Sequence, residues 1–216
     1  MQTVQYVNQS LAAPQTRSIL TWKRPLDLAV GLLALVVAGP IFLIIAALVR
    51  LSSPGSVFFA QTRIGKNGQP FKMYKFRSMY IDAEARRAEV LAQSDREGIC
   101  FKSKNDPRIT PVGRWLRRLS LDELPQVLNV IKGDMSLVGP RPALPSEVAV
   151  YPARAMQRLS VLPGITGLWQ VSGRAEIGFD EMVEMDIHYA RNAGLITDLS
   201  IMLRTFGAVF SGRGAY

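Results

Sequence analysis

Cysteine and histidine are almost absent from this chain of 216 residues, which has one of each, Cys100 and His188. A lone cysteine excludes an internal disulfide, and a lone histidine excludes a metal site built from several imidazoles. Neither GxxxxGK(S/T) nor GxGxxG occurs, so nucleotide binding by either familiar glycine-rich loop is unsupported. Chemistry in this protein would therefore depend on carboxylates and basic side chains, and any metal would have oxygen ligands.

Acidic residues are fewer than basic ones: 17 Asp and Glu stand against 26 Lys and Arg, a formal net charge of +9. Such a surface attracts polyanions, which include nucleic acid, anionic lipid head groups and phosphorylated substrates. The chain is long enough for one substantial core with a small additional element.

Charged side chains are missing altogether between Leu28 and Val49, an apolar run that is long enough to cross a bilayer. A polar N-terminal stretch precedes this run and no small-residue cleavage pattern follows it, so it is not a signal peptide. We therefore predict a membrane segment. Pro40, preceded by Gly39, lies near its middle, where proline removes a helical hydrogen bond and clashes with the preceding turn. The helix should bend or break there.

Two topologies fit this segment. Basic residues flank both of its ends, with Lys23 and Arg24 before it and Arg50 after it, and the positive-inside rule places both flanks on the cytoplasmic side. A re-entrant hairpin broken at Gly39 and Pro40 satisfies the rule, and neither half, at roughly 18 and 14 Å, spans the hydrocarbon core alone. An ordinary kinked span is the alternative that this segment leaves open.

The rest of the chain predicts a mainly helical α+β domain with a small β-hairpin. Two β-rich runs, residues 57–65 and 69–78, are joined through an Asn-Gly dipeptide, which is typical of tight hairpins. Lys75 and Arg77 alternate with apolar residues in the second run, so this strand should have a cationic front. RWLRRLS, residues 114–120, predicts an amphipathic element at a membrane surface. Further helices are expected over residues 81–95, 120–132, 146–159, 180–192 and 197–210.

LSLDELPQ, residues 119–126, places Asp122 and Glu123 side by side. Ser120 followed by Glu123 is a capping-box pattern, which predicts a helix that begins at Ser120. The dipole and free amides of a first helical turn favour the anionic form of a carboxylate. An ionised Asp122 is a competent nucleophile toward phosphorus, provided that a metal or arginines offset the repulsion from phosphate oxygens.

Three arginines are candidates for that role, because a guanidinium group can bind phosphate through two hydrogen bonds. They are Arg117 just upstream, Arg141 in GPRP and Arg174 in SGR. The flanking prolines restrict the backbone at Arg141, so little conformational freedom remains to be lost on binding. Taken singly, each arginine also fits an ordinary surface or ion-pair role.

Five stretches follow one another along the chain: KRPLDL with the proline-broken apolar segment, QTRIGKNGQPFKMYKFRSM, DPRITPVGRWLRRLSLDELPQ, NVIKGDMSLVGPRP and PGITGLWQVSGR. In this order they closely resemble the bacterial sugar transferase family, the monotopic phosphoglycosyl transferases. The resemblance covers residues 23 to about 212, which is nearly the whole chain.

This resemblance implies transfer of a sugar 1-phosphate from a UDP-sugar to undecaprenyl phosphate with release of UMP, the first membrane step of polysaccharide or glycoconjugate assembly. Asp122 would attack the β-phosphorus and form a covalent phospho-sugar enzyme, and Glu123 would assist. Mg²⁺ in contact with Asp122 would polarise the phosphoryl group. The residues expected to bind the phosphorylated substrates are Lys75, Arg77, Arg117, Arg141 and Arg174.

The resemblance also implies a re-entrant membrane segment and an active site at the cytoplasmic face of the bacterial inner membrane. Residues 1–22 would be a flexible N-terminus, 23–51 a membrane helix-break-helix and 52–216 the cytoplasmic catalytic domain. The family usually has serine before the breaking proline, and Gly39 departs from that pattern. The C-terminal motifs look most like exopolysaccharide hexose transferases, which points to glucose or galactose 1-phosphate. A homodimer is compatible with the sequence, which defines no oligomeric state.

Two other functions stay open at this level. The net charge of +9 would suit a membrane-anchored nucleic-acid-binding module, but that function leaves the apolar run and the acidic pair unexplained. The second of these functions is that of a scaffold protein without catalytic activity in a polysaccharide assembly. The transferase hypothesis predicts no nucleic-acid partner.

Overall fold

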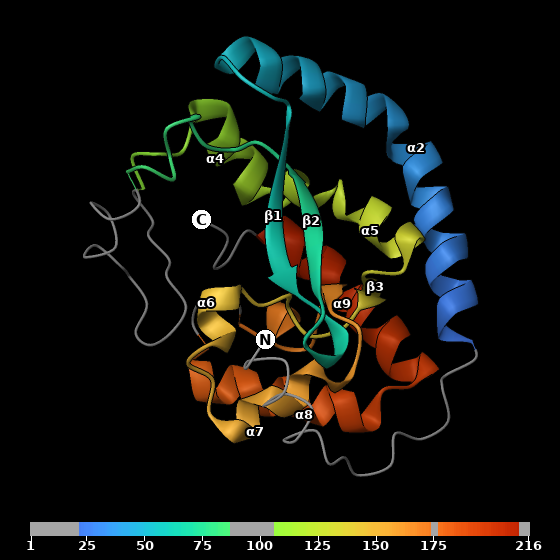
Figure 1. The fold of residues 1–216 in the computed structure, drawn as a ribbon. Coiled ribbons are helices and arrows are strands. Elements are labelled where there is room, and N and C mark those ends of the chain that lie inside the picture. The colour runs from blue at the N-terminus through green and yellow to red at the C-terminus, as the bar shows by residue number, and fades with distance from the viewer. Residues whose placement is uncertain (1–21, 87–105, 174–176, 212–216) are drawn as a thin grey trace.

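A computed structural model of the protein describes residues 22–86, 106–173 and 177–211 (Figure 1). Cys100, Arg174 and much of the helix expected over 81–95 lie outside the described residues. Helices surround two small sheets, which confirms a mixed helix and strand class. The elements are α2 (Lys23–Ser52), β1 (Phe58–Ile64), β2 (Pro70–Phe76), α4 (Pro111–Arg118), α5 (Gln126–Lys132), β3 (Ser136–Val138), α6 (Pro145–Val148), α7 (Ala153–Met156), β4 (Gly164–Thr166), α8 (Phe179–Asn192) and α9 (Leu195–Ser211), with short 3₁₀ turns at Lys66–Gly68, Leu121–Glu123, Gln157–Ser160 and Trp169–Val171.

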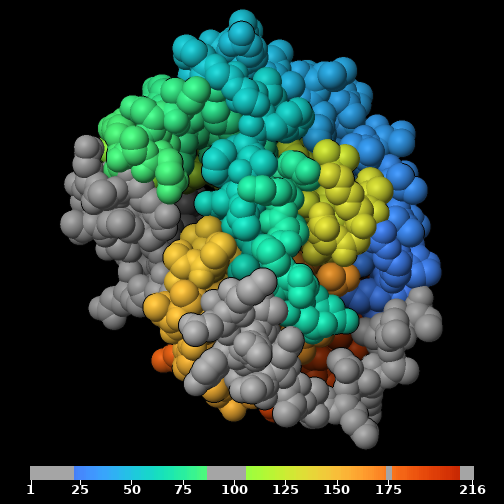
Figure 2. Space-filling view, in the orientation of Figure 1, coloured from blue at the N-terminus to red at the C-terminus, as the bar shows by residue number. Residues whose placement is uncertain are grey.

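Strands β1 and β2 form the predicted antiparallel hairpin, which pairs Phe58 with Phe76 at one end and Ile64 with Pro70 at the other. The Asn-Gly dipeptide in its turn has φ values of 54° and 76°, a left-handed conformation that asparagine and glycine tolerate best. Figure 2 shows the hairpin crossing the front of the molecule between α5 and α6.

The other edge of β2 is closed by a side chain instead of a strand. Asn129 of α5 is fully buried; its side-chain oxygen accepts a hydrogen bond from Tyr74 N at 3.0 Å, and its amide donates to Lys72 O at 2.7 Å. These bonds satisfy backbone groups that an edge strand would leave unpaired. They also fix α5 against β2, so the turn before α5 contacts this strand.

The parallel pairing of β3 with β4, Ser136 opposite Gly164 and Val138 opposite Thr166, was not predicted from the sequence. Each strand has three residues, which is too short for an alternating pattern to be recognised. The backbones approach closely beside them: a Cβ added to Gly139 would lie 2.4 Å from Leu162 O. Glycine is therefore required where the chain leaves β3.

Helix α2 contains the apolar segment and runs without interruption through Pro40 for 30 residues. Figure 1 shows that it changes direction along its length. The expected bend is present, but the expected break into two helices is wrong. Proline lacks the N–H donor of one helical hydrogen bond, and its ring clashes with a carbonyl in the preceding turn. A bend relieves this clash without ending the helix.

Burial along α2 is confined to its two ends. Asp27 and Gly31 are buried near the start and Ile45 and Val49 near the end, whereas no residue in 32–44 is buried. Gly31 faces α5, and Ile45 and Val49 pack with Phe76 and Leu116 in one apolar cluster. The middle of α2, with its large apolar side chains, therefore lies on the surface. The most exposed of these are Leu33, Val36, Val37, Leu43 and Ile44.

Polar contacts bind both ends of α2 to the rest of the protein. At the start, Arg24 donates to the carbonyls of Val130 and Ile131 at the end of α5, at 2.5 and 2.7 Å. Lys23 pairs with Asp198 of α9, which also accepts a hydrogen bond from Tyr189.

At the other end of α2, the Arg77 guanidinium donates to the carbonyls of Ser53 and Pro54 at 2.6 and 2.5 Å. The guanidinium also donates to Val49 O at 3.3 Å, one of the carbonyls that a helix C-terminus leaves unpaired. Both ends of the apolar helix are thus anchored on the same globular body.

Two other helix predictions need correction. The helix expected over 120–132 is a 3₁₀ turn at Leu121–Glu123 followed by α5, and the helix expected over 146–159 is divided into α6 and α7. Prolines at positions 125 and 152 cannot donate the interior hydrogen bonds of a longer helix. The helices expected over 180–192 and 197–210 are confirmed as α8 and α9.

Candidate active site

Helix α4 leads into the acidic pair and is fixed at its start. Its N-cap residue, Thr110, accepts a hydrogen bond from Gly113 N at 2.9 Å, the usual device for satisfying an open helix start. A Cβ on Gly113 would lie 1.9 Å from Ser78 O. Glycine therefore allows α4 to lie directly on the backbone that follows β2.

The turn that carries Asp122 and Glu123 is not the helix start that the sequence predicts. Ser120 has φ 55° and makes no side-chain capping bond, so the predicted capping box is absent. A capping serine needs extended backbone angles to aim its hydroxyl at the following amides, and the left-handed conformation of Ser120 prevents this. The sharp reversal at Ser120 turns the chain from α4 into the Leu121–Glu123 turn.

Asp122 is buried, with 6% of its surface exposed. Burial raises the pKa of its carboxyl, as does repulsion from Glu123, while attraction from Lys75 and Arg117 opposes the shift. The expectation that helix amides would dominate and favour the anion is therefore wrong. A single 3₁₀ turn has almost no macrodipole, and loss of water outweighs the backbone amides.

Glu123 differs from its neighbour because it has a cationic partner. Lys75 Nζ lies 2.7 Å from Glu123 Oε1. Burial alone would raise the pKa of the Glu123 carboxyl, but the charge and hydrogen bond of Lys75, with Arg141 and Arg63, outweigh it and lower the pKa. The pair thus combines a carboxylate held by lysine with a desolvated aspartate.

Arg117 lies on the same side of the site. Its Nε donates to Ser78 Oγ at 2.9 Å. Burial lowers the pKa of the guanidinium, and the charges of Asp122 and Asp106 oppose this. Its attraction for Asp122 places a fixed positive group near the aspartate, as the sequence predicts.

Arg141 also acts on the acidic pair electrostatically, since it contributes to the lowered pKa of Glu123. Its guanidinium lies 3.3 Å from Glu147 Oε2, and its side chain is 28% exposed. The buried Arg158 donates to Arg141 O at 3.4 Å and pairs with Asp186 of α8. Helix α8 therefore supports the loop that presents Arg141.

Arg63 was not predicted from the sequence as a site residue. This β1 residue is buried, its guanidinium donates to Pro142 O at 2.9 Å, and its charge helps to lower the pKa of Glu123. It thereby links the hairpin to the GPRP loop behind Arg141. The signal available in the sequence was a basic residue inside a β-rich run, but its partner lies far along the chain.

One of the expected substrate-binding residues, Arg77, does not join this group, and another is not described. Arg77 is 8% exposed and its guanidinium is bound by the end of α2, as described above, so its predicted phosphate contact is corrected to a structural one. Strand β2 ends at Phe76, so the alternation that placed Arg77 beside Lys75 does not extend to it. Arg174 lies outside the described residues.

The arrangement can therefore bind an anion and present a buried carboxylate to it. Lys75, Arg117, Arg141 and Arg63 supply positive charge around two adjacent carboxylates. Fixed cations can stabilise the phosphate charge that resists attack by an anionic nucleophile.

Comparison with known proteins points the same way. The family model described as "Bacterial sugar transferase" matches residues 18–212. Exopolysaccharide production protein ExoY of Sinorhizobium fredii is 43% identical over 198 residues, which cover 90% of this chain and 88% of that protein.

Two longer relatives carry more specific names. Undecaprenyl-phosphate galactose phosphotransferase of Salmonella typhimurium is 39% identical over 217 residues, 97% of this chain and 44% of that protein. Undecaprenyl-phosphate glucose phosphotransferase of Komagataeibacter xylinus is 38% identical over 222 residues, 96% of this chain and 40% of that protein. The chain thus spans less than half the length of these two relatives.

Proposed function

Because this chain belongs to the bacterial sugar transferase family, we propose that it is a polyprenyl-phosphate sugar phosphotransferase. It moves a hexose 1-phosphate, glucose or galactose, from a UDP-sugar to undecaprenyl phosphate and releases UMP. The observation that carries the proposal is the buried Asp122 beside the Lys75–Glu123 pair and Arg117. The names of the relatives, which specify phosphotransfer of galactose or glucose to this lipid phosphate, support it.

The reaction proceeds in two displacements at one phosphorus atom. A carboxylate oxygen of Asp122 attacks the β-phosphorus of the UDP-sugar, the bond to the bridging oxygen breaks, and UMP departs with that oxygen and its electron pair. An oxygen of the lipid phosphate then attacks the same phosphorus, and the Asp122 carboxylate is the leaving group. The products are UMP and the polyprenyl diphosphosugar, and the enzyme is regenerated.

The neighbouring side chains have separate roles in this reaction. Burial of Asp122 keeps water, the competing nucleophile, away from the phospho-sugar intermediate. Arg117 and Arg141 offset phosphate charge, and Lys75 neutralises Glu123 so that the second carboxylate does not repel the substrate. Arg63 positions the GPRP loop through Pro142.

Mg²⁺ fits the donor set of the site. The ion usually binds through one or two carboxylates together with substrate phosphates and water. No group of three or more His, Cys, Asp or Glu side chains able to hold a metal occurs among the described residues, and Glu123 is engaged by Lys75. Asp122 would therefore hold the ion, which when bound would neutralise diphosphate charge and polarise the phosphoryl group.

The way in which α2 is anchored supports a proposal for its position in the membrane. A straight helix of 30 residues is about 45 Å long, so a transmembrane path would separate its ends by the bilayer. Both ends are instead bound to the catalytic body, while the bent, apolar middle is exposed. We infer a re-entrant helix in one leaflet, with the active site at the cytoplasmic face of the inner membrane.

The test is UMP release from a panel of UDP-sugars with undecaprenyl phosphate and Mg²⁺, with the lipid product identified by mass spectrometry. UDP-glucose or UDP-galactose should give UMP and the matching lipid-linked sugar. Asp122→Asn should lower kcat by at least about a thousandfold, since the nucleophile is removed. Asp180→Asn, the same change on the exposed start of α8, should leave kcat within about twofold. Equal activity of the two variants would refute the proposal.

A further inference from the structure

An open apolar hollow of about 400 Å³ lies where the end of α2 meets α4. It is lined by Leu48 of α2 and by Pro111, Val112 and Trp115 of α4. Small-molecule sites of a few hundred Å³ are large enough to hold a compact organic group. Trp115 is 48% exposed and Leu48 is 39% exposed, so both side chains are accessible to a ligand that enters from outside.

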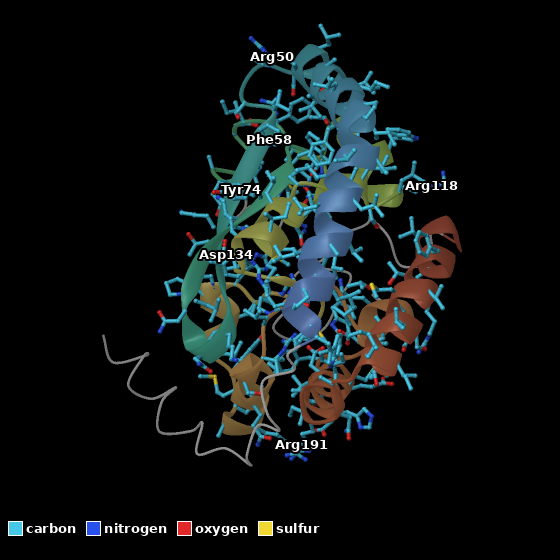
Figure 3. The ribbon with its side chains drawn as sticks, turned by 90° about the vertical axis from the view of Figure 1, so that its right-hand side faces the viewer. Arg50, Phe58, Tyr74, Arg118, Asp134 and Arg191 are labelled. Carbon is cyan, nitrogen blue, oxygen red and sulfur yellow. The ribbon has the colours of Figure 1, made fainter. Side chains whose placement is uncertain are left out.

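The hollow continues the exposed apolar surface of α2. Figure 3 shows α2 running along the face turned to the viewer, with Arg50 at its upper end. Arg114 and Arg118 are exposed on either side of Trp115 along α4, which is the pattern of a helix lying among lipid head groups. A ligand in the hollow would thus have its apolar part in contact with lipid and its polar part near the head-group level.

The same helix also leads to the reactive carboxylate. Val112 packs in the apolar cluster that includes Leu121 and Leu124, the residues flanking the acidic pair. Arg117, one turn from Gly113 on α4, has its guanidinium near Asp122. Helix α4 therefore presents an apolar wall on one side and a cationic group beside the nucleophile on another.

We propose that this hollow, on the helix that leads to the acidic pair, binds the isoprenoid chain of the acceptor lipid. This inference rests on the proposed function, since it assigns a chain-binding site to that acceptor. A polyprenyl phosphate has a branched apolar chain joined directly to a dianionic group. The hollow offers an apolar surface, and the exposed Arg114 and Arg118 beside Trp115 offer positive charge. Trp115 forms the outer wall that holds the first isoprene units.

The experiment fills the hollow without touching the acidic pair. Leu48→Trp is compared with Leu43→Trp, the same change at a residue of α2 that is 74% exposed and does not line the hollow. Both proteins, in nanodiscs of fixed lipid composition, are assayed for transfer to undecaprenyl phosphate, with KM measured separately for donor and acceptor. Trp115→Ala, which removes the wall, is a second variant.

Leu48→Trp should raise the acceptor KM by about tenfold, which corresponds to about 1.4 kcal/mol, because excluded isoprene carbons stay unburied. Its donor KM and its kcat at saturating acceptor should stay within about twofold. Trp115→Ala should raise the acceptor KM in the same way, and Leu43→Trp should change nothing.

Other outcomes separate the two proposals. An unchanged acceptor KM in both Leu48→Trp and Trp115→Ala would overturn the chain-binding site while leaving the transferase function intact. An equal rise of the acceptor KM in Leu43→Trp would also overturn the chain-binding site, because the effect would then come from a changed position of the protein in the bilayer. Absence of any transfer by the wild-type protein would instead refute the proposed function.

Discussion

At the residue scale, Ser120 is the position where the structure departs most informatively from the sequence pattern. A non-glycine residue at φ 55° carries a backbone cost of about 1–2 kcal/mol. The residue stands directly before the turn that carries Asp122, so the strain sets the direction of the nucleophile. Strained conformations persist only where the surrounding contacts enforce them.

The effect of substitutions at Ser120 on the free energy of unfolding should depend on how well each residue tolerates positive φ, and not on whether its side chain can cap a helix. Ser120→Gly should leave the free energy of unfolding unchanged or raise it by up to about 1 kcal/mol, and Ser120→Val should lower it by about 1–2 kcal/mol, because a β-branched residue is poorly tolerated at positive φ. Denaturant unfolding of the detergent-solubilised protein measures both. If Ser120→Gly were as damaging as Ser120→Val, a side-chain function of the serine would be indicated.

Substitution of Arg77 should mainly lower stability, whereas substitution of Lys75 should mainly lower activity. Arg77→Gln should lower the free energy of unfolding by about 3 kcal/mol, because buried carbonyls at the end of α2 lose their donors. The folded fraction should keep its donor KM. Lys75→Gln should instead lower kcat with a smaller stability loss, since Lys75 is paired with Glu123 at the site. Thermal unfolding and initial rates on the same preparations decide this, and the reverse pattern would restore the substrate role first expected for Arg77.

The sequence identified the acidic pair because two adjacent carboxylates beside arginines are a local pattern. It could not identify Arg63, whose role depends on Pro142, a contact between residues that lie far apart in the chain. It misplaced Arg77 because an alternating pattern does not reveal where the strand ends. Burial of Asp122, which determines its protonation, is likewise a property of the folded chain only.

At the element scale, α8 is joined to the GPRP loop through the buried Arg158–Asp186 pair. Among the described residues, Asp186 Oδ1 has no hydrogen-bond partner. Burial therefore raises the pKa of Asp186 from 3.8 to about 6, against the attraction of Arg158 and Arg141. The folded state thus binds this proton more strongly than the unfolded state does.

This shift predicts a pH dependence of stability with a definite sign. The contribution of Asp186 to the free energy of unfolding is fully present below about pH 4 and is lost as the pH rises through about 6. Urea unfolding at pH 4, 5, 6 and 7 should show this decline in the wild-type protein and lack it in Asp186→Asn. Parallel pH profiles for the two proteins would contradict the assigned shift.

The elements that the sequence predicted well are those with sustained local signals. The hairpin has its Asn-Gly turn, and α8 and α9 have clear helical periodicity. The parallel β3–β4 pair was missed because three-residue strands carry no period. The helices expected over 120–132 and 146–159 were drawn too long, because periodic apolar residues do not show whether a proline will end one helix and begin another.

At the scale of the whole molecule, the position of α2 bears on the membrane topology. Its two ends are bound to one body and its exposed middle is bent (Figure 1). The sequence alone left a kinked span and a re-entrant segment open. The anchoring contacts favour the re-entrant path, since a span would have to break one set of them.

Cysteine labelling in intact cells tests this topology. In a Cys100→Ser background, single cysteines at Ser10 and Ser56, which precede and follow α2 in the sequence, should both resist a membrane-impermeant maleimide until the cells are permeabilised. The reason is that the proposed re-entrant path keeps both flanks of the helix on the cytoplasmic side. Labelling of the Ser10→Cys protein in intact cells would instead establish a transmembrane path.

We propose that Asp122 forms a covalent bond to the sugar phosphate during the reaction. The most direct measurement is intact-protein and peptide mass spectrometry after rapid quenching of the enzyme with UDP-galactose or UDP-glucose in the absence of lipid acceptor. We expect a hexose-phosphate adduct on the peptide that contains Asp122, with UMP released in equal amount, and no adduct in Asp122→Asn. Transfer to undecaprenyl phosphate by Asp122→Asn at the wild-type rate, or an adduct on a different residue, would contradict it.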